Sequence, residues 1–320
     1  MSRRKLMSPR PLVSCLAALA LTLLWSSPAS GAPASRFNDP PPHRGGAEVR
    51  MTYGGRTHAC SSGFAVRRVE DGKRAMTTAG HCAPTPTEAT SGEHPFGTFV
   101  RSFHDNEVDA ALIGGTPAKP QLYAPTLWTN GGTPSTPVAR RVLGKADGPV
   151  KYQKVCVSGK VTKLVCDIEV YNLTSGESCE DEPPRICTRG LVLAGKEGVN
   201  IVAQGDSGAP VFVPIDTEID GHKVYGVMLV GMLVGGGPRR QGGPEDLVVF
   251  HSVKQIECAL NARVLTTAEA ESGDTAPPPA RSDCAQSSTT RSLALSERNA
   301  ATDRPSSSTS ARSAREKRRS

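Results

Sequence analysis

The segment Gln204-Gly205-Asp206-Ser207-Gly208-Ala209-Pro210 decides how the rest of this chain is interpreted. It sets one serine in a glycine-flanked turn directly before an apolar run. Glycine lets a peptide turn inward without strain, so neighbouring N–H groups can converge on one point. A serine hydroxyl is a poor nucleophile unless a base removes its proton. The segment can equally be an ordinary turn, because all its residues are turn formers. A decision needs a histidine and a carboxylate elsewhere in the chain.

Two upstream motifs supply such residues. Thr78-Ala79-Gly80-His81-Cys82 places a histidine at the end of an apolar segment, and Glu107-Val108-Asp109 places an acid at the head of a buried strand. Histidine has the pKa of a general base near neutrality, and a buried carboxylate fixes its tautomer. Alone, His81 is compatible with a packed side chain and Asp109 with the start of a strand. The order histidine, aspartate, serine favours a nucleophilic triad over coincidence.

Further segments give the chain a family resemblance. Cys60-Ser61-Ser62-Gly63-Phe64-Ala65-Val66 precedes the histidine, and Val155-Cys156-Val157-Ser158-Gly159 is followed by Cys166. Together with the AGHC and GDSG motifs, they resemble chymotrypsin-like (trypsin-fold) serine proteases. The secreted bacterial branch of the streptogrisins and α-lytic protease is the most similar. The resemblance covers about residues 48–262.

The resemblance implies a fold and a set of roles. The fold is all-β, with two antiparallel six-stranded β-barrels and the active site between them. His81 would be the general base and acid, Asp109 the orienting carboxylate and Ser207 the nucleophile. The oxyanion hole would be formed by Gly205 and Ser207, and Asp206 would be a buried structural acid that needs a cationic partner.

Several residues depart from the family pattern. Ala209 stands where a second glycine is usual, and no Ile-Val-Gly-Gly start is present. Val157 occupies the position at which the streptogrisins usually carry an arginine. The residue pattern therefore assigns neither the partner of Asp206 nor the activation route.

The resemblance also predicts the substrate pocket. Its floor would be the residue six positions before the serine, Ile201, followed by Val202. The substrate-pairing strand would lie within residues 226–237, in either of two registers. Both registers are apolar, so we expect cleavage after apolar residues and rejection of basic ones. One of three glycines would form the pocket wall: Gly231, Gly235 or Gly236.

Short apolar runs separated by turn residues predict an all-β body. A final segment, residues 253–264, sets Val253, Ile256, Leu260 and Val264 on one helical face and predicts a C-terminal helix. The expected strands cover residues 63–69, 97–103, 108–113, 138–143, 161–173, 190–194, 210–215, 223–234 and 247–252.

The ends of the chain predict an exported protein. Residues 1–34 have a basic start, an apolar run and small residues, as in a secretory signal peptide, by either the general or the twin-arginine route. Residues 35–47 are expected to be a short exposed leader, 48–267 the protease domain and 268–320 a disordered tail rich in Ser, Thr, Pro and Arg. The mature protein is expected to be extracellular.

Removal of the signal takes Cys15 away and leaves eight of the nine cysteines. An even number of cysteines in an oxidising compartment indicates disulfides. A zinc site would need CxxC-type spacing, and the sequence has none. Their clustering suggests the pairs Cys60–Cys82, Cys156–Cys166, Cys179–Cys187 and Cys258–Cys284.

Charge and hydropathy exclude other classes of protein. The net charge is +7, of which residues 1–32 carry +4 and residues 268–320 carry +2. A domain near neutrality gives no electrostatic footprint for nucleic acid. We expect a monomer that acts on proteins or peptides, needs no cofactor or metal and has no integral membrane span once mature. Two alternatives remain open: a catalytically silent protein of the same fold that binds a peptide or cell-surface partner, and a cell-wall protein held by its basic tail. The glycosylation sequon Asn172-Leu173-Thr174 is taken as a coincidence.

Overall fold

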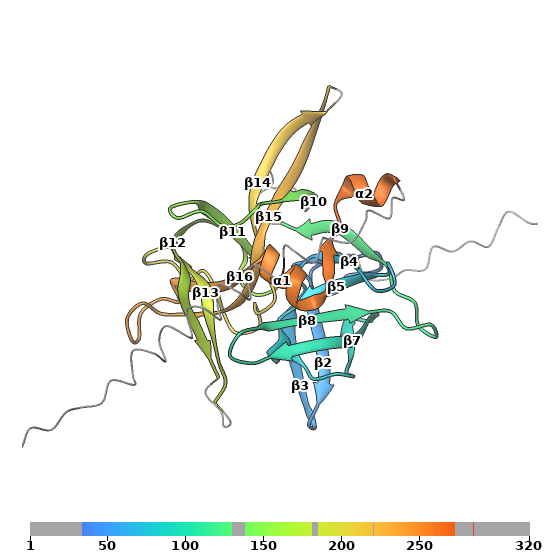
Figure 1. The fold of residues 1–320 in the computed structure, drawn as a ribbon, viewed down its shortest axis with the longest axis horizontal. Coiled ribbons are helices and arrows are strands. Elements are labelled where there is room, and N and C mark those ends of the chain that lie inside the picture. The colour runs from blue at the N-terminus through green and yellow to red at the C-terminus, as the bar shows by residue number, and fades with distance from the viewer. Residues whose placement is uncertain (1–33, 130–137, 181–184, 220, 273–283, 285–320) are drawn as a thin grey trace, which may run out of the picture. The chain divides into compact units, whose positions relative to one another are not determined.

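A computed structural model describes residues 34–129, 138–180, 185–219, 221–272 and 284 (Figure 1). The predicted signal peptide, apart from Ala34, lies outside the described residues, and so does most of the predicted tail. The described chain is built from two β-sheets with two short helices near its end. The expected all-β architecture is confirmed.

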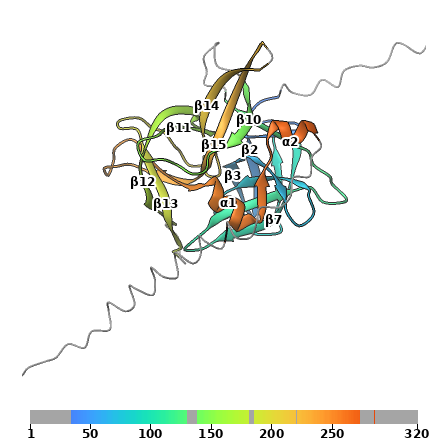
Figure 2. The same cartoon turned by 45° about the horizontal axis from the view of Figure 1, so that its top comes forward.

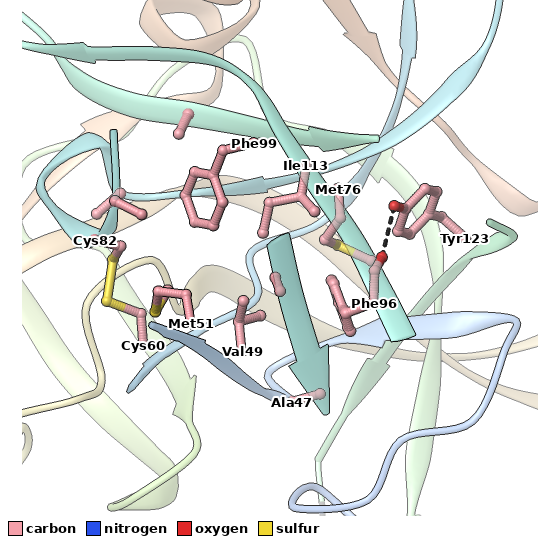
Figure 3. Packing of buried hydrophobic residues seen from close by; sticks show 14 of the residues in the cluster. Ala47, Val49, Met51, Cys60, Met76, Cys82, Phe96, Phe99, Ile113 and Tyr123 are labelled. Atoms are coloured by element: carbon pink, nitrogen blue, oxygen red, sulfur yellow. Dashed lines mark hydrogen bonds between the residues drawn. A yellow bond between two sulfur atoms is a disulfide. The ribbon is translucent and has the colours of Figure 1, made fainter. Parts of the chain in front are cut away.

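The first sheet has eight strands, all antiparallel, in the order β17-β4-β5-β8-β7-β6-β2-β3. One face buries a cluster that includes Val49, Met51, Met76, Phe99 and Ile113 (Figure 3). Alternate residues of β2 (Val49, Met51) and of β8 (Ala111, Ile113) lie in this cluster, in keeping with the two-residue period of a strand. The strands are β2 (Glu48–Tyr53), β3 (Arg56–Ser61), β4 (Ala65–Arg68), β5 (Arg74–Thr78), β6 (Glu88–Ser91), β7 (His94–His104), β8 (Asp109–Gly114) and β17 (Ala262–Val264).

The second sheet has nine strands, and six of them close a ring. Strands β14, β11, β12, β13 and β16 follow one another, and β15 pairs with both β14 and β16. This ring is the antiparallel six-stranded barrel expected for the second half of the chain. The remaining three strands extend it through a parallel pairing of β10 with β15, and β1 also pairs with β9 in parallel, which the sequence did not predict. The strands are β1 (His43–Gly45), β9 (Tyr123–Trp128), β10 (Ala139–Lys145), β11 (Lys154–Gly159), β12 (Lys163–Cys179), β13 (Cys187–Gly195), β14 (Pro210–Ile219), β15 (His222–Gly237) and β16 (Leu247–Ser252).

Two hairpins of the second sheet are much longer than the barrel needs. In both views the outer part of the β14–β15 hairpin projects from the body as a two-stranded ribbon (Figures 1 and 2). The β12–β13 hairpin projects in another direction and is closed by the Cys179–Cys187 disulfide. We call the described part of this hairpin, residues 163–180 and 185–195, the β12–β13 arm.

The predicted C-terminal helix is shorter than expected. Helix α1 (Val253–Leu260) begins with a capping box, in which Ser252 and Gln255 satisfy each other's backbone N–H groups. It ends because Asn261 adopts a left-handed conformation (φ 48°), and the chain then continues as β17. A second helix, α2 (Thr267–Ser272), begins at the expected domain boundary, so the first residues of the predicted tail are ordered.

The expectation of an exposed leader is wrong. Arg36, Asp39 and His43 are at most 1% exposed, and the segment that carries them packs against Trp128 of β9. Its hydrogen bonds reach residues more than a hundred positions away, which explains why the local composition did not reveal the burial.

The structure forms the four disulfides suggested by the cysteine spacing: Cys60–Cys82, Cys156–Cys166, Cys179–Cys187 and Cys258–Cys284. Disulfides of this number are typical of proteins in an oxidising compartment. Among the described residues, no helix has the length and apolar character needed to cross a bilayer.

Candidate active site

His81 is held in a short 3-10 turn, Gly80–Cys82, that follows β5. Cys82 ties this turn to Cys60 at the end of β3. Only glycine fits at Gly80, because a Cβ there would lie 1.8 Å from the carbonyl oxygen of Phe103. The turn that carries His81 is therefore fixed by the Cys82 disulfide after the histidine and by close backbone packing at Gly80 before it.

Asp109 opens β8 and is 2% exposed. Its Oδ2 lies 2.7 Å from Nδ1 of His81, and its Oδ1 accepts the N–H groups of Gly80 (2.6 Å) and His81 (3.0 Å). An ionised carboxylate that accepts these bonds requires a proton on Nδ1, which leaves Nε2 as the acceptor on the opposite edge of the ring. Behind the carboxylate, the N–H of Asp109 donates to Nε2 of the buried His251 (3.1 Å).

The electrostatics of the pair favour a charged imidazole. Burial disfavours protonation of His81, but the Asp109 carboxylate, its hydrogen bond and the more distant Glu180 outweigh burial and raise the pKa of His81. Burial likewise opposes ionisation of Asp109, and the His81 contact overcomes it and lowers the pKa of Asp109. Such a pair stabilises an imidazolium that forms when the ring accepts a proton.

Ser207 lies in the turn between Ile201 and β14. Gly205 (φ 100°) and Gly208 (φ 87°) take backbone conformations that favour glycine, and this shapes the turn. Ser61 fixes it by donating its N–H to the carbonyl of Ser207 (2.9 Å) and its hydroxyl to that of Gly205 (3.1 Å). Among the described residues, the N–H groups of Gly205 and Ser207 donate to no protein acceptor.

One cavity of about 370 Å³ joins these parts. Gly205, Ser207 and His81 all line it, so both sheets contribute to its walls. The hydroxyl of Ser207 makes no hydrogen bond with His81 in the described structure; such bonds are often long before substrate binds. The other lining residues are Tyr53, Thr57, His58, Ala59, Cys60, Cys82 and Gln204.

Asp206 is fully buried next to Ser207. Its carboxylate accepts the N–H of Val161 (2.8 Å), the hydroxyl of Thr162 (2.8 Å) and the N–H of Ala203 (2.9 Å). It packs on Gly159, where a Cβ would lie 2.1 Å from Oδ1. The charge of Asp206 also acts on Arg36, a residue of the segment expected to be an exposed leader, and opposes the fall in the pKa of that guanidinium.

The predicted pocket residues lie in different surroundings. Ile201 (0% exposed) and Val202 (6%) belong to the core of the second barrel. Gly231 lies inside the sheet between Val211 of β14 and Ser252 of β16, and a Cβ there would meet the ring of Phe250. Gly236 lines a cavity of about 280 Å³ beside the β12–β13 arm, and a Cβ on Gly235 would contact Ser178 of the arm.

The structure adds residues that sequence reasoning missed. His104 packs against His81 with ring centroids 5.8 Å apart, and its Nδ1 lies 3.5 Å from Glu180 at the end of β12. No local pattern marks these residues, because the β12–β13 arm brings them together. The N–H of Arg189 in the arm also donates to the carbonyl of Asn106 (3.0 Å), in the turn between β7 and β8.

Two clusters superficially suit a metal ion: Cys60 with His81 and Cys82, and Glu177 with Cys179 and Cys187. In each, both cysteines form a disulfide with each other. A metal needs the free thiolate, so neither cluster has the donors of a metal site while the disulfides are intact.

Two β-sheets, the second closed into a barrel, with His81 and Ser207 lining one cavity and Asp109 bonded to the imidazole, are the arrangement of the chymotrypsin-like protease fold. Comparison with solved structures gives the same fold: Nocardiopsis protease (NAPase) matches with a TM-score of 0.50 and 22% identity, over 70% of this chain and 98% of that chain. Cellulomonas bogoriensis chymotrypsin matches at 0.49 and 24%, over 70% and 98%, and the alpha-lytic protease homolog N4 at 0.47 and 18%, over 69% and 97%. No family model and no curated protein matches the chain.

Proposed function

We propose that this protein is a secreted serine endopeptidase. The observation that carries the proposal is the shared cavity of His81, Ser207 and Gly205, with Asp109 bonded to the far side of the imidazole. Four disulfides and the predicted signal peptide support secretion. The substrates are proteins or peptides.

The reaction proceeds through an acyl-enzyme. Nε2 of His81 takes the proton of the Ser207 hydroxyl as its oxygen attacks the scissile carbonyl carbon. The resulting oxyanion accepts hydrogen bonds from the N–H groups of Gly205 and Ser207. His81 then gives its proton to the departing amine, and the C–N bond breaks. Water, deprotonated by the same histidine, hydrolyses the ester and restores Ser207.

The pairing site for the substrate is the free end of β15. Strand β14 begins at Pro210, opposite Met232, so no described strand pairs with residues 234–237 on the side that β14 occupies. An extended peptide adds to such an edge by backbone hydrogen bonds. This selects the register in which Gly235 and Gly236 face the substrate.

The residue before the scissile bond is apolar and small. The buried Val202 packs against Gly236, where a Cβ would lie 2.6 Å from a methyl of Val202, so the core beneath the proposed pairing edge, which also holds Ile201, is apolar and uncharged. Burying an unpaired Arg, Lys or Glu side chain there would cost several kcal/mol. Each methylene changes discrimination by about 1–3 kcal/mol, so Ala, Val and Leu should be preferred over Phe by modest factors.

A fluorophosphonate probe tests the proposal, because it reacts only with an activated serine. The wild-type protein should be labelled. The Ser207→Ala variant should keep its fold but should not be labelled. Absence of labelling in the wild type would instead support the alternative, a catalytically silent binding protein. A panel of para-nitroanilide peptides varied at one residue tests the pocket, and faster turnover after Arg or Glu than after Ala or Leu would refute it.

A further inference from the structure

Arg36 is the largest fully buried side chain of the described structure and carries a charge. Its guanidinium donates to the carbonyls of Gly46 (2.7 Å), Trp128 (3.0 Å) and Gly159 (3.1 Å), and to the hydroxyl of Ser158 (2.8 Å). Burying a guanidinium is costly unless its donors are satisfied and a counter-charge is near. The acceptors of these hydrogen bonds therefore identify the part of the chain that Arg36 stabilises.

That part of the chain includes the turn after β11, which holds the loop of the reactive serine. Ser158 and Gly159 end β11, and the next residues, Val161 and Thr162, give the N–H and hydroxyl groups that bind Asp206. Asp206 is the neighbour of Ser207 in the chain. The contacts therefore run from Arg36 through the end of β11 to the carboxylate of Asp206, and from there to the nucleophile.

Charge supports the same connection. Burial lowers the pKa of Arg36 to about 10, and the charge of Asp206 opposes that fall. The guanidinium remains protonated at neutral pH. Gly159 separates the two groups: its carbonyl accepts from Arg36, and its Cα lies against the Asp206 carboxylate.

The segment around Arg36 is built to receive it. Gly46 adopts φ 75°, and a Cβ there would lie 2.9 Å from the guanidinium and 2.7 Å from the carbonyl oxygen of Ser158. Three residues after Arg36, the buried Asp39 accepts a hydrogen bond from Nε1–H of Trp128 (3.0 Å) and forms an ion pair with Arg44 (2.7 Å). The segment is thus anchored at two points against the second sheet.

We infer that Arg36 is a positioning residue for Ser207, and that docking of the segment of residues 35–44 is what orders the reactive loop of residues 203–208. The inference rests on the proposed peptidase function for its kinetic consequence. The positive charge that orders the loop is then the side chain of Arg36. The site therefore forms without an N-terminal amine released by cleavage. Removal or undocking of the segment switches the site off.

The test compares Arg36→Gly with Arg141→Gly, which removes an arginine outside the segment; that arginine lies on β10, is about half exposed and pairs with Glu271 of α2. Hydrogen exchange of residues 159–162 and 203–208 should be at least tenfold faster in Arg36→Gly and unchanged in Arg141→Gly. Fluorophosphonate labelling and kcat should fall about 100-fold with little change in KM, a loss comparable to that of one oxyanion-hole donor. Added guanidinium ion should restore part of the labelling rate.

Arg36→Lys and Ser158→Ala, which keep more of the packing, provide the same readouts if Arg36→Gly does not fold. Each should give a smaller effect in the same direction. Wild-type exchange at residues 203–208 in a folded Arg36 variant would overturn the inference. Faster exchange in a protein whose wild type is never labelled would uphold the positioning role and refute the peptidase proposal, so the two failures are distinguishable.

Discussion

The Cys60–Cys82 disulfide should be a main source of stability in the first sheet. The perturbation is the double substitution Cys60→Ala and Cys82→Ala, which opens a loop whose ends are 22 residues apart. In the chain-entropy account, closing such a loop stabilises the folded state by about 3.4 kcal/mol at 25 °C. Both sulfur atoms also lie in the core, where Cys60 is 6% and Cys82 2% exposed, so their loss adds a packing cost.

The assay is urea unfolding together with calorimetry. A loss of about 3.4 kcal/mol should lower the Tm by roughly 7–13 °C for a domain of this size. A matched control is Cys179→Ala with Cys187→Ala, whose ends are 8 residues apart and whose expected cost is about 2.5 kcal/mol.

Activity separates the two bonds further. Cys82 follows His81 directly and both line the cavity, so the first double variant should also lose turnover at temperatures where it is folded. A loss of less than about 1 kcal/mol for the Cys60 and Cys82 variant, or an equal loss for both variants, would refute the loop-length reasoning.

Three other predictions concern the site. Asp109→Asn should reduce kcat by roughly 10⁴ with little change in KM, because the amide cannot enforce the required tautomer of His81; a stopped assay on a peptide ester measures it. Glu180→Gln should move the acid limb of the kcat profile to lower pH, since removing that negative charge lowers the raised pKa of His81 and the unprotonated form then persists to lower pH; Glu177→Gln, whose carboxylate pairs with Arg189, should leave the profile in place. Gly208→Ala should destabilise the fold by about 2 kcal/mol or more, because a Cβ at φ 87° would lie 2.4 Å from the carbonyl oxygen of Ser61; urea unfolding within about 0.5 kcal/mol of wild type would contradict it.

The sequence alone determined the features whose causes are local. The order of His81, Asp109 and Ser207 identified the fold, because each motif combines a chemical group with the turn or strand that presents it. Cysteines that lie 8 to 26 residues apart were paired from their spacing. Helix α1 was predicted from its apolar period, although its end was not, because Asn261 stops it in a left-handed conformation.

Only the tertiary structure decided what depends on contacts distant in the chain. The segment of residues 35–47 is polar and rich in Pro and Gly, so its composition indicated exposure. It is buried because Arg36 donates to backbone carbonyls, among them that of Gly159, 123 residues away. Backbone acceptors leave no side-chain pattern in the sequence. The free edge of β15 likewise exists only because β14 begins opposite Met232. Hydrophobic period and turn chemistry report on neighbours within a few residues, whereas the surroundings of a buried charge are set by whichever strands the folded chain brings against it.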